Sequence, residues 1–463
     1  MLMGMTLLLC TFLINCSFAT QLPFSSGPST LSSTVSHHRV VRVPEEHTSL
    51  AEAVTLSKNG DRILVGPGIY YETLTLPNHD LSIESTHGAE HTFIDGGGNS
   101  LKPSPNSIIQ LGPYAGKVQI SGFTIQHGWS NEGGGLRVAG GSIEVKDCQF
   151  NSCHSIFGGG LCLLQGTLRL TNCEVHHCSA TFGGGIAVIT GDAHLANTTV
   201  SNCTAEASGG GGWCDNAGWV KANGCTWVNC SASQGGALSI QGQLRLERSL
   251  VHSCQSEGYG GGLQLTAAAS GNLHQVRMHE NSAQVGGGIH VAAGATLHAQ
   301  RISIFCCQAN RGGGISTLGK STIHQATIRS CKAQAGGGAI SLGRAHPQAT
   351  LKIHNAVIKE NEANHGGAVY GDPTGYLSLI NTDLQENQAR HDGGGLHLHG
   401  VECWLEDVAF SGNRAPKTTD LSFRDGRLSW FNISRSGPVY GTGAILLDGP
   451  ELELAVARTA SKD

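Results

Sequence analysis

Apolar and polar residues alternate in short segments along most of this chain, and the segments return at a regular interval. In one of them, apolar Val145 lies between the charged residues Glu144 and Lys146. Strict alternation is the pattern of a β-strand that buries one of its faces. The equivalent apolar positions of later segments are Leu170, Leu195, Leu246, Leu273, Ile323, Ile353, Leu379 and Leu405. The pattern therefore predicts short, half-buried strands, and helical spacing is absent from the repeats.

Two further signals keep the same interval. A glycine triplet or Gly-Gly-Ala precedes an apolar strand, and eleven copies lie about 24 to 29 residues apart between Gly133 and Asn413. Later in each repeat, an apolar residue is followed three positions on by Cys or Asn. These residues are Cys153, Cys178, Cys203, Cys230, Cys254, Asn281, Cys307, Cys331, Asn361, Asn387 and Asn413.

A fixed period of strands without helices predicts a solenoid. We expect an all-β fold, a single-stranded right-handed parallel β-helix with a short N-terminal helix and strand as a cap. Each coil then bonds to the coils above and below it, about 4.8 Å away, so that like residues stack. The Cys and Asn positions become a structural ladder, because Asn bonds to nearby backbone and Cys packs as a small apolar group.

The repeats resemble those of chlamydial polymorphic outer-membrane protein passengers over residues 128–413. The strict motif matches are Gly235-Gly236-Ala237-Leu238, Gly337-Gly338-Ala339-Ile340, Gly366-Gly367-Ala368-Val369 and Phe410-Ser411-Gly412-Asn413. This resemblance implies an adhesin-like protein. The stretch Gly68-Ile69-Tyr70-Tyr71-Glu72 resembles the opening of pectin-lyase-like proteins, a superfamily with polysaccharide lyases, hydrolases and epimerases.

Five segments are expected along the chain. Residues 1–19 form a signal peptide, because the apolar run is too short to span a membrane and Ser17-Phe18-Ala19 is a small-x-small cleavage site. Alternatives are a lipoprotein attached at Cys16 and a cytosolic chain. Residues 20–43 are a low-order linker, 44–127 the N-terminal cap and first coils, 128–413 the array of about eleven coils, and 414–463 a C-terminal cap and tail. The mature protein is expected to be secreted or on the cell surface, without a transmembrane segment.

The cap contains the one predicted helix. Ser49-Leu50-Ala51-Glu52 has the capping-box pattern, so we expect a helix from there through about Ser57. A strand over Arg62 to Val65 should follow.

Charge and composition narrow the partners. The 463 residues carry a formal net charge of −5, which excludes a polybasic protein that binds nucleic acid. The expected partners are a polysaccharide or a host or cell-surface protein. Four asparagines fit the N-glycosylation pattern, namely Asn197, Asn202, Asn229 and Asn432.

Sixteen cysteines raise the question of disulfides. Stacked residues on adjacent coils lie close enough for a bridge in an oxidising compartment. The hypothetical pairs are Cys148 with Cys173, Cys153 with Cys178, and Cys203 with Cys230. The alternative is a reduced ladder of buried thiols, and the sequence leaves both open. Because cysteines at zinc-finger spacing recur with the coil period, we expect no metal site from them.

Catalytic groups are not evident. No Asp or Glu occupies the outward positions of the strands that follow the glycines. The residues at these positions are Arg137, Cys162, Ala187, Cys214, Ser239, Gln264, His290, Ser316, Ser341, Tyr370 and His397. Asn381-Thr382-Asp383 matches one polygalacturonase motif whose companions are missing, which makes Asp383 a turn residue. The exposed histidines His274, His324 and His354 either bind metal, respond to acidic pH or are ordinary surface residues.

We therefore expect no catalytic residue, metal or cofactor. The predicted function is a β-helix that binds glycan or protein on its side faces. The alternative is a polysaccharide-active lyase, hydrolase or epimerase whose site residues are not recognised.

Overall fold

The fold is described from a computed structural model that covers residues 39–97, 106–343, 349–434 and 439–447, the last of these by backbone alone. The chain divides into two units, Met1–His37 and His38–Asp463, and all described residues belong to the second. The expected signal peptide, most of the linker and the tail after residue 447 lie outside the described residues.

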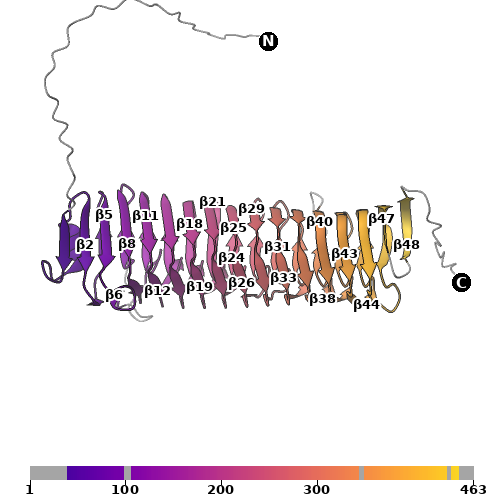
Figure 1. The fold of residues 1–463 in the computed structure, drawn as a ribbon, viewed down its shortest axis with the longest axis horizontal. Helices are drawn as coiled ribbons and strands as arrows, with labels where there is room; N and C mark the ends of the chain where they lie inside the picture. Colours follow the sequence, from indigo (N-terminus) through magenta and orange to yellow (C-terminus); the bar gives the residue numbers. More distant parts are fainter. Residues whose placement is uncertain (1–38, 98–105, 344–348, 435–438, 448–463) are drawn as a thin grey trace, which may run out of the picture. The chain divides into compact units, whose positions relative to one another are not determined.

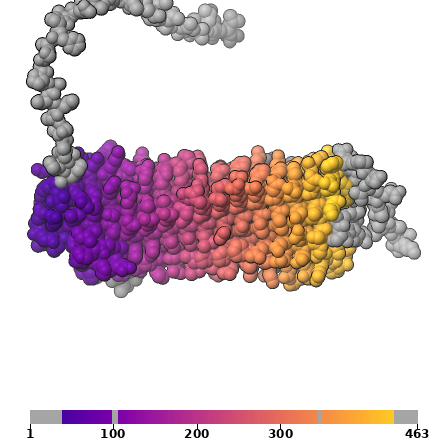
Figure 2. Space-filling model, viewed as in Figure 1, coloured from indigo at the N-terminus to yellow at the C-terminus, as the bar shows by residue number. Residues whose placement is uncertain are grey.

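The second unit winds as a parallel β-solenoid whose coils lie side by side along one axis (Figure 1). In the space-filling view the coils follow one another along this axis in sequence order, from indigo to yellow (Figure 2). All of its strand pairings are parallel and join equivalent residues of successive coils. Val145 pairs with Leu170, and Leu170 pairs with Leu195. The predicted all-β parallel solenoid is thus confirmed. The described part of the chain contains no helix long and apolar enough to cross a membrane.

Each full coil presents four faces. The first face carries the alternating strands. They are β1 (Val40–Val43), β2 (Asp61–Val65), β5 (Leu81–Ser85), β8 (Lys117–Ser121), β11 (Ser142–Lys146), β15 (Thr167–Thr171), β25 (Gln243–Glu247), β29 (Ser270–His274), β32 (Thr296–Gln300) and β36 (Lys320–His324).

The second face precedes the Cys and Asn ladder. Its strands are β3 (Gly68–Tyr70), β6 (Thr92–Asp95), β9 (Thr124–Gln126), β12 (Gln149–Asn151), β16 (Glu174–His176), β19 (Thr199–Ser201), β22 (Thr226–Val228), β26 (Leu250–His252), β30 (Arg277–His279), β33 (Ser303–Phe305) and β37 (Thr327–Arg329). Three longer strands run over the first and second faces, namely β40 (Thr350–Lys359), β43 (Tyr376–Gln385) and β46 (Glu402–Ser411).

The third face lies between the ladder and the glycines. Its strands are β13 (His154–Phe157), β17 (Ser179–Phe182), β20 (Thr204–Ser208), β23 (Ser231–Gln234), β27 (Gln255–Ser256), β34 (Gln308–Arg311), β38 (Lys332–Gly336), β41 (Glu362–His365) and β44 (Gln388–Asp392).

The fourth face follows the glycines. Its strands are β4 (Leu74–Leu76), β7 (Ile109–Leu111), β10 (Leu136–Val138), β14 (Leu161–Leu163), β24 (Leu238–Ile240), β28 (Leu263–Leu265), β31 (Ile289–Val291), β35 (Ile315–Thr317), β39 (Ile340–Leu342), β42 (Val369–Gly371) and β45 (Leu396–His399). Four long strands run over the fourth and first faces, namely β18 (Ile186–Ala196), β21 (Gly212–Asn223), β47 (Leu421–Phe431) and β48 (Val439–Leu447).

Left-handed backbone at fixed positions bends the coil. The turn from first to second face places Asn172 at φ 53° and Asn197 at φ 49°, and the turn from second to third face places Asn202 at φ 52°. Asn tolerates this conformation better than most residues because its short side chain bonds locally. These turns hold the four predicted glycosylation sites, and the side chains of Asn197, Asn202, Asn229 and Asn432 are all exposed.

The glycines form the corner between the third and fourth faces, which we call the glycine corner. Gly158 has φ 66°, and a Cβ there would collide with the carbonyl oxygen of Leu161. A Cβ on Gly159 would collide with the carbonyl of Gly184 in the next coil. The corner therefore needs glycine both for its conformation and for the close approach of two backbones.

The Cys and Asn ladder lies in the core, at the turn from second to third face, and every member is buried. The asparagines bond along the axis. Asn361 Nδ2 donates to Asn387 Oδ1 at 2.9 Å, and Asn387 Nδ2 donates to Asn413 Oδ1 at 3.0 Å. Each Oδ1 also accepts the backbone N–H of the preceding ladder residue, as Asn387 Oδ1 does from Asn361. The buried amides are satisfied in this way, so that they avoid the cost of unpaired polar groups.

The ends of the solenoid differ from expectation in two places. Strand β1 begins at Val40 and pairs with β2, so the expected linker boundary at residue 43 lies too far along the chain. The segment expected to be a C-terminal cap instead adds β47 and β48 to the coils, because its alternating pattern continues. The cap helix α1 (Leu50–Thr55) begins after Ser49, whose Oγ accepts the N–H of Glu52.

All fourteen described cysteines are thiols, including the three hypothetical disulfide pairs. Thirteen of them are buried and Cys306 is exposed. Burial raises the pKa of the Cys403 thiol far above its ordinary value, and burial is also the main reason why the pKa of Cys148 is raised. A buried thiol that resists ionisation is a poor nucleophile.

Thiol accessibility gives a direct test of the ladder. In the chain without residues 1–19, which contain Cys10 and Cys16, we expect a disulfide-exchange reagent to modify Cys306 quickly in the native protein and the thirteen buried thiols only after unfolding. Counting the modified thiols before and after denaturation, without reductant, measures the numbers of exposed and buried thiols. The Cys306→Ser variant should lose the fast phase. A deficit of pairs of thiols after denaturation would instead establish coil-to-coil disulfides.

The glycine corner can be tested with one matched pair of variants. Gly286 and Gly294 both have positive φ, but only at Gly286 would a Cβ collide with a neighbouring carbonyl, that of Ile289. We expect Gly294→Ala to lower the free energy of unfolding by about 1–2 kcal/mol through conformation alone. Gly286→Ala should cost roughly 1–3 kcal/mol more because the core must shift. Urea denaturation measures both, and equal losses would contradict the close approach.

Candidate functional site at the glycine corner

Outward side chains of the third and fourth faces meet at the glycine corner, because the chain bends inward there. Phe157 and Phe182, each directly before a glycine triplet, pack against Cys162, Ala187 and Trp213 of the fourth face. The rings of Phe182 and Trp213 have centroids 5.3 Å apart. We call this packed junction the corner groove, a name for the line of contact between the two faces and not for an open cavity. One wall holds the residues that precede the glycines, and the other holds the outward residues of the fourth face.

Facing residues pair along the corner groove. Near its N-terminal end, Arg137 Nε donates to Glu132 Oε2 at 2.7 Å. Further along, the Tyr259 and His290 rings lie 4.6 Å apart. The fourth-face positions expected to face solvent are therefore mostly covered, since the exposed fractions of Cys162, Ser239, His290, Ser316 and Ser341 do not exceed 3%.

The prediction that Cys214 points outward is wrong. Ala187 pairs with Trp213, and Val188 pairs with Cys214. Trp213 therefore lines the corner groove while Cys214 lies in the core. The reason is a fourth consecutive glycine, because Gly212 takes the inward position opposite Ile186 and shifts the following residues by one.

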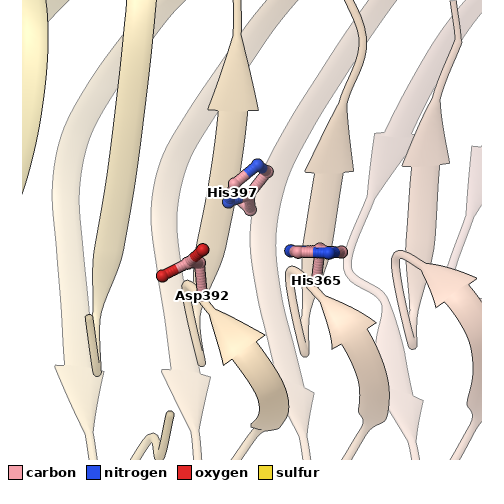
Figure 3. A group of neighbouring side chains, drawn as sticks. All are labelled: His365, Asp392 and His397. Carbon is pink, nitrogen blue, oxygen red and sulfur yellow. The ribbon is translucent and has the colours of Figure 1, made fainter. Parts of the chain in front are cut away.

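At the C-terminal end of the groove, His365, Asp392 and His397 converge (Figure 3). His365 ends β41 and Asp392 ends β44, whereas His397 lies on β45 across the corner. A register shift after Ala363 places His365 opposite Asp392 and leaves His391 as the additional residue. One nitrogen or oxygen of each side chain lies within 4.8 Å of the others, and no other group of three His, Cys, Asp or Glu meets this condition in the described part of the chain.

Burial controls the charge of these histidines. It lowers the pKa of His397 to about 4, with His365 as the next cause, and it also lowers the pKa of His365. Both rings are therefore neutral near pH 7. The Nδ1 atoms of His365 and His397 are buried and have no hydrogen-bond partner among the described residues. Asp392 has a weak ionic contact, since Lys417 Nζ lies 3.9 Å away.

A tyrosine supports one side of the group. The Tyr370 ring stacks on His397 at a centroid distance of 5.6 Å, and its hydroxyl donates to Asp372 Oδ1 at 2.9 Å. Asp372 also accepts from Arg311 Nη1 at 3.1 Å. Burial and the nearby Asp372 carboxylate raise the pKa of Tyr370. The arrangement keeps the tyrosine neutral and fixes the ring next to His397.

The same third-face strands carry a hollow of about 710 Å³ on their outer surface. Gln284, Asn310, Gln334 and Asn364 lie at equivalent positions of four successive coils along it, and we call this hollow the amide trough. Its floor contains alanines such as Ala309 and Ala333. Its border is charged, with Glu362 bonded to Lys332 at 3.4 Å and to Arg390 at 3.2 Å. The hydrogen bond from Arg390 is the main reason why the pKa of Glu362 is lowered.

The predicted surface histidines lie elsewhere. His274 and His324 line a second hollow, of about 990 Å³, on the first face. The His324 and His354 rings stack at 4.7 Å without a third ligand group near them in the described residues. Asp383 lies on β43 and accepts only a long hydrogen bond from Gln385, at 3.4 Å. None of these residues belongs to the corner groove or the amide trough.

The sequence analysis did not identify the residues directly before the glycine triplets as site residues. In chain order this row is Glu132, Phe157, Phe182, Ser208, Gln234, Tyr259, Val285, Arg311, Gly336, His365 and Asp392. A tabulation of that position would have placed a histidine and an aspartate on consecutive coils. Because alternation does not reveal the angle between two faces, the pairing with Tyr370 and His397 was beyond the sequence.

Comparison with known proteins agrees with this geometry at the level of fold. Residues 134–324 match the family model described as a right handed beta helix region. The match covers the middle of the parallel solenoid seen in the structure (Figure 1). No curated protein matches the chain.

Two solved structures are similar to the chain at low identity. A PL6 alginate lyase in complex with a trisaccharide has 10% identity over 90% of this chain and 88% of its own, with a TM-score of 0.33. The A-module of the Azotobacter vinelandii mannuronan C-5 epimerase AlgE6 has 11% identity over 87% of this chain and 94% of its own, with a TM-score of 0.26.

The buried His290 predicts a pH dependence of stability. Burial alone lowers its pKa to about 4, from an ordinary value of about 6.5 in the unfolded chain. Between these values the unfolded chain binds the proton more readily, so stability is complete above pH 6.5 and falls by about 3 kcal/mol as the pH drops toward 4. His290→Gln should flatten this part of the profile. Urea denaturation at several pH values measures it, and His298→Gln, an exposed histidine of the same coil, should leave the slope unchanged.

Proposed function

We propose that this β-helix is an exported binding protein that holds an extended polysaccharide along the amide trough. The observation that carries the proposal is the row of carboxamides, Gln284, Asn310, Gln334 and Asn364, repeated once per coil beside an open hollow. A carboxamide donates and accepts, so it suits the hydroxyl and ring oxygens of sugars. The coil spacing of about 4.8 Å is comparable with the length of a sugar residue, which matches one polymer to many coils.

The charges around the trough favour binding over catalysis. Glu362 is neutralised by Lys332 and Arg390, and Asp372 in the neighbouring groove bonds to Arg311 and Tyr370. A catalytic general acid needs a pKa close to the working pH, whereas the hydrogen bond from Arg390 lowers the pKa of Glu362. The polysaccharide-active enzyme remains the alternative, and the same experiment tests it.

Export is part of the proposal. It is supported by the apolar run and the small-x-small site within residues 1–19, and by the repeats that resemble outer-membrane passengers. Detection of the processed chain outside the cytoplasm is the corresponding observation.

Two carboxamides provide the test. We expect the purified protein to retain at least one member of a panel of alginate, pectate and neutral glucans, and Asn310→Ala with Gln334→Ala to weaken retention about 5- to 100-fold, as expected for two lost hydrogen bonds. The matched control is Asn272→Ala with Gln300→Ala, two exposed amides of the first face. Affinity electrophoresis measures retention. Loss in the control alone would place the site on the first face, and release of shortened products would replace the binder with the enzyme.

A further inference from the structure

The group His365, Asp392 and His397 has features that polysaccharide binding does not explain. Two imidazoles and one carboxylate from three separate strands meet at the end of a groove whose other described pairs are aromatic, amide or ionic. Their ligand atoms lie within 4.8 Å of one another. Figure 3 shows the His365 ring, the His397 ring and the Asp392 carboxylate around one shared space.

A second observation points to an occupant. The Nδ1 atoms of both His365 and His397 are buried without a hydrogen-bond partner among the described residues. A buried polar atom without a partner costs about 1–3 kcal/mol, and such groups in native proteins call for an explanation. One cation bound next to the Asp392 carboxylate would satisfy both of these nitrogen atoms together.

We propose that His365, Asp392 and His397 bind one divalent transition-metal ion of the zinc class. Two neutral imidazoles and a carboxylate are a donor set that such an ion prefers, and three protein ligands leave a coordination position open to water or another ligand. Calcium and magnesium prefer oxygen ligands, so a site with two nitrogen donors suits them poorly. The metal site is independent of the polysaccharide proposed for the amide trough.

The geometry is close to that of a bound ion. Ligand atoms of a tetrahedral zinc at about 2.0–2.1 Å lie about 3.3 Å apart, so the group must contract by roughly 1.5 Å at most. Rotation of the His365 and Asp392 side chains, which are only partly buried, can supply this contraction. Stacking on Tyr370 holds the plane of the His397 ring.

The neighbouring groups permit binding. Lys417 is the cation near Asp392, but its side chain is 75% exposed and its contact is 3.9 Å, so it can withdraw into solvent. His391 lies with its ring centroid 5.0 Å from that of His365 and is exposed. The histidine pairs on other faces, His324 with His354 and His252 with His279, have no third side chain whose ligand atom lies within 4.8 Å of both histidines in the described residues. Glu280 Oε2 lies 3.9 Å from His279 Nδ1 but does not complete such a group.

Zinc titration of the full chain, freed of metal with a chelator, tests the site without any polysaccharide. We expect isothermal titration calorimetry to give one ion per chain. His365→Ala, Asp392→Asn and His397→Gln should each weaken zinc binding by at least about 100-fold, since even the partners of metal ligands are worth 10- to 100-fold. His391→Ala and His324→Ala should leave the affinity unchanged. Urea denaturation of each variant verifies that it is folded, and Asp392→Asn preserves the shape of the side chain.

Cobalt(II) as the probe separates this site from the thiols. We expect visible absorption of a nitrogen and oxygen site, without the charge-transfer band that a thiolate ligand gives. A thiolate band, absence of stoichiometric binding, or affinity that the three variants leave intact would overturn the proposal. Retention of polysaccharide by the metal-free protein is measured separately, so failure of one proposal is distinguishable from failure of the other.

Discussion

The close approach of backbones at the glycine corner is the constraint on which the rest of the structure depends. The glycine triplets turn the chain and also bond from coil to coil as strands do. The backbone N–H of Gly135 donates to Gly160 O, and that of Gly160 donates to Gly185 O, both at 2.9 Å. A side chain at the first or second position would separate the coils and break these bonds in both directions. The third position is less strict. There Ala237, Ala339 and Ala368 are accommodated with their methyl groups buried in the core.

The same corner is where outward side chains of the third and fourth faces pack on each other. On an ordinary convex turn, outward residues diverge into water. Here the inward bend brings them together, so Phe182 contacts Trp213, and His365 lies beside His397. The glycines carry no chemistry themselves, but they decide which residues meet. Because each coil supplies a new pair, one groove changes along its length from an ionic pair, Glu132 with Arg137, through aromatic and amide pairs to histidine and aspartate.

The sequence predicts the repeating parts of this molecule well. Alternation identifies the strands, and the glycine and Cys or Asn signals give the coil, since equivalent residues do stack as Val145 and Leu170 do. It fails where a local event changes the register or the angle between faces. The fourth glycine at Gly212 exchanges Trp213 for Cys214 in the groove, and the shift after Ala363 brings Asp392 rather than His391 opposite His365. Both are displacements by a single residue. Because side chains of a strand alternate between its two faces, a shift of one residue moves a side chain to the opposite face.

The ladder explains why the core can change its chemistry along the axis without changing its shape. A thiol needs no partner, so Cys153 and Cys178 can stack in any number, and their protons make only weak contacts with backbone carbonyls such as Phe150 O, 3.7 Å from Cys178 Sγ. An asparagine requires partners on both sides, and three in succession provide them, with Asn387 bonded to Asn361, Asn413 and the carbonyl of Ile358. An isolated buried asparagine would lack this chain of donors and acceptors. Asn281 therefore binds the backbone of the preceding coil, accepting from Cys254 N and donating to Val251 O, which lets one amide stand among thiols. The fold thus tolerates either residue provided that every buried amide finds backbone or another amide at the coil spacing.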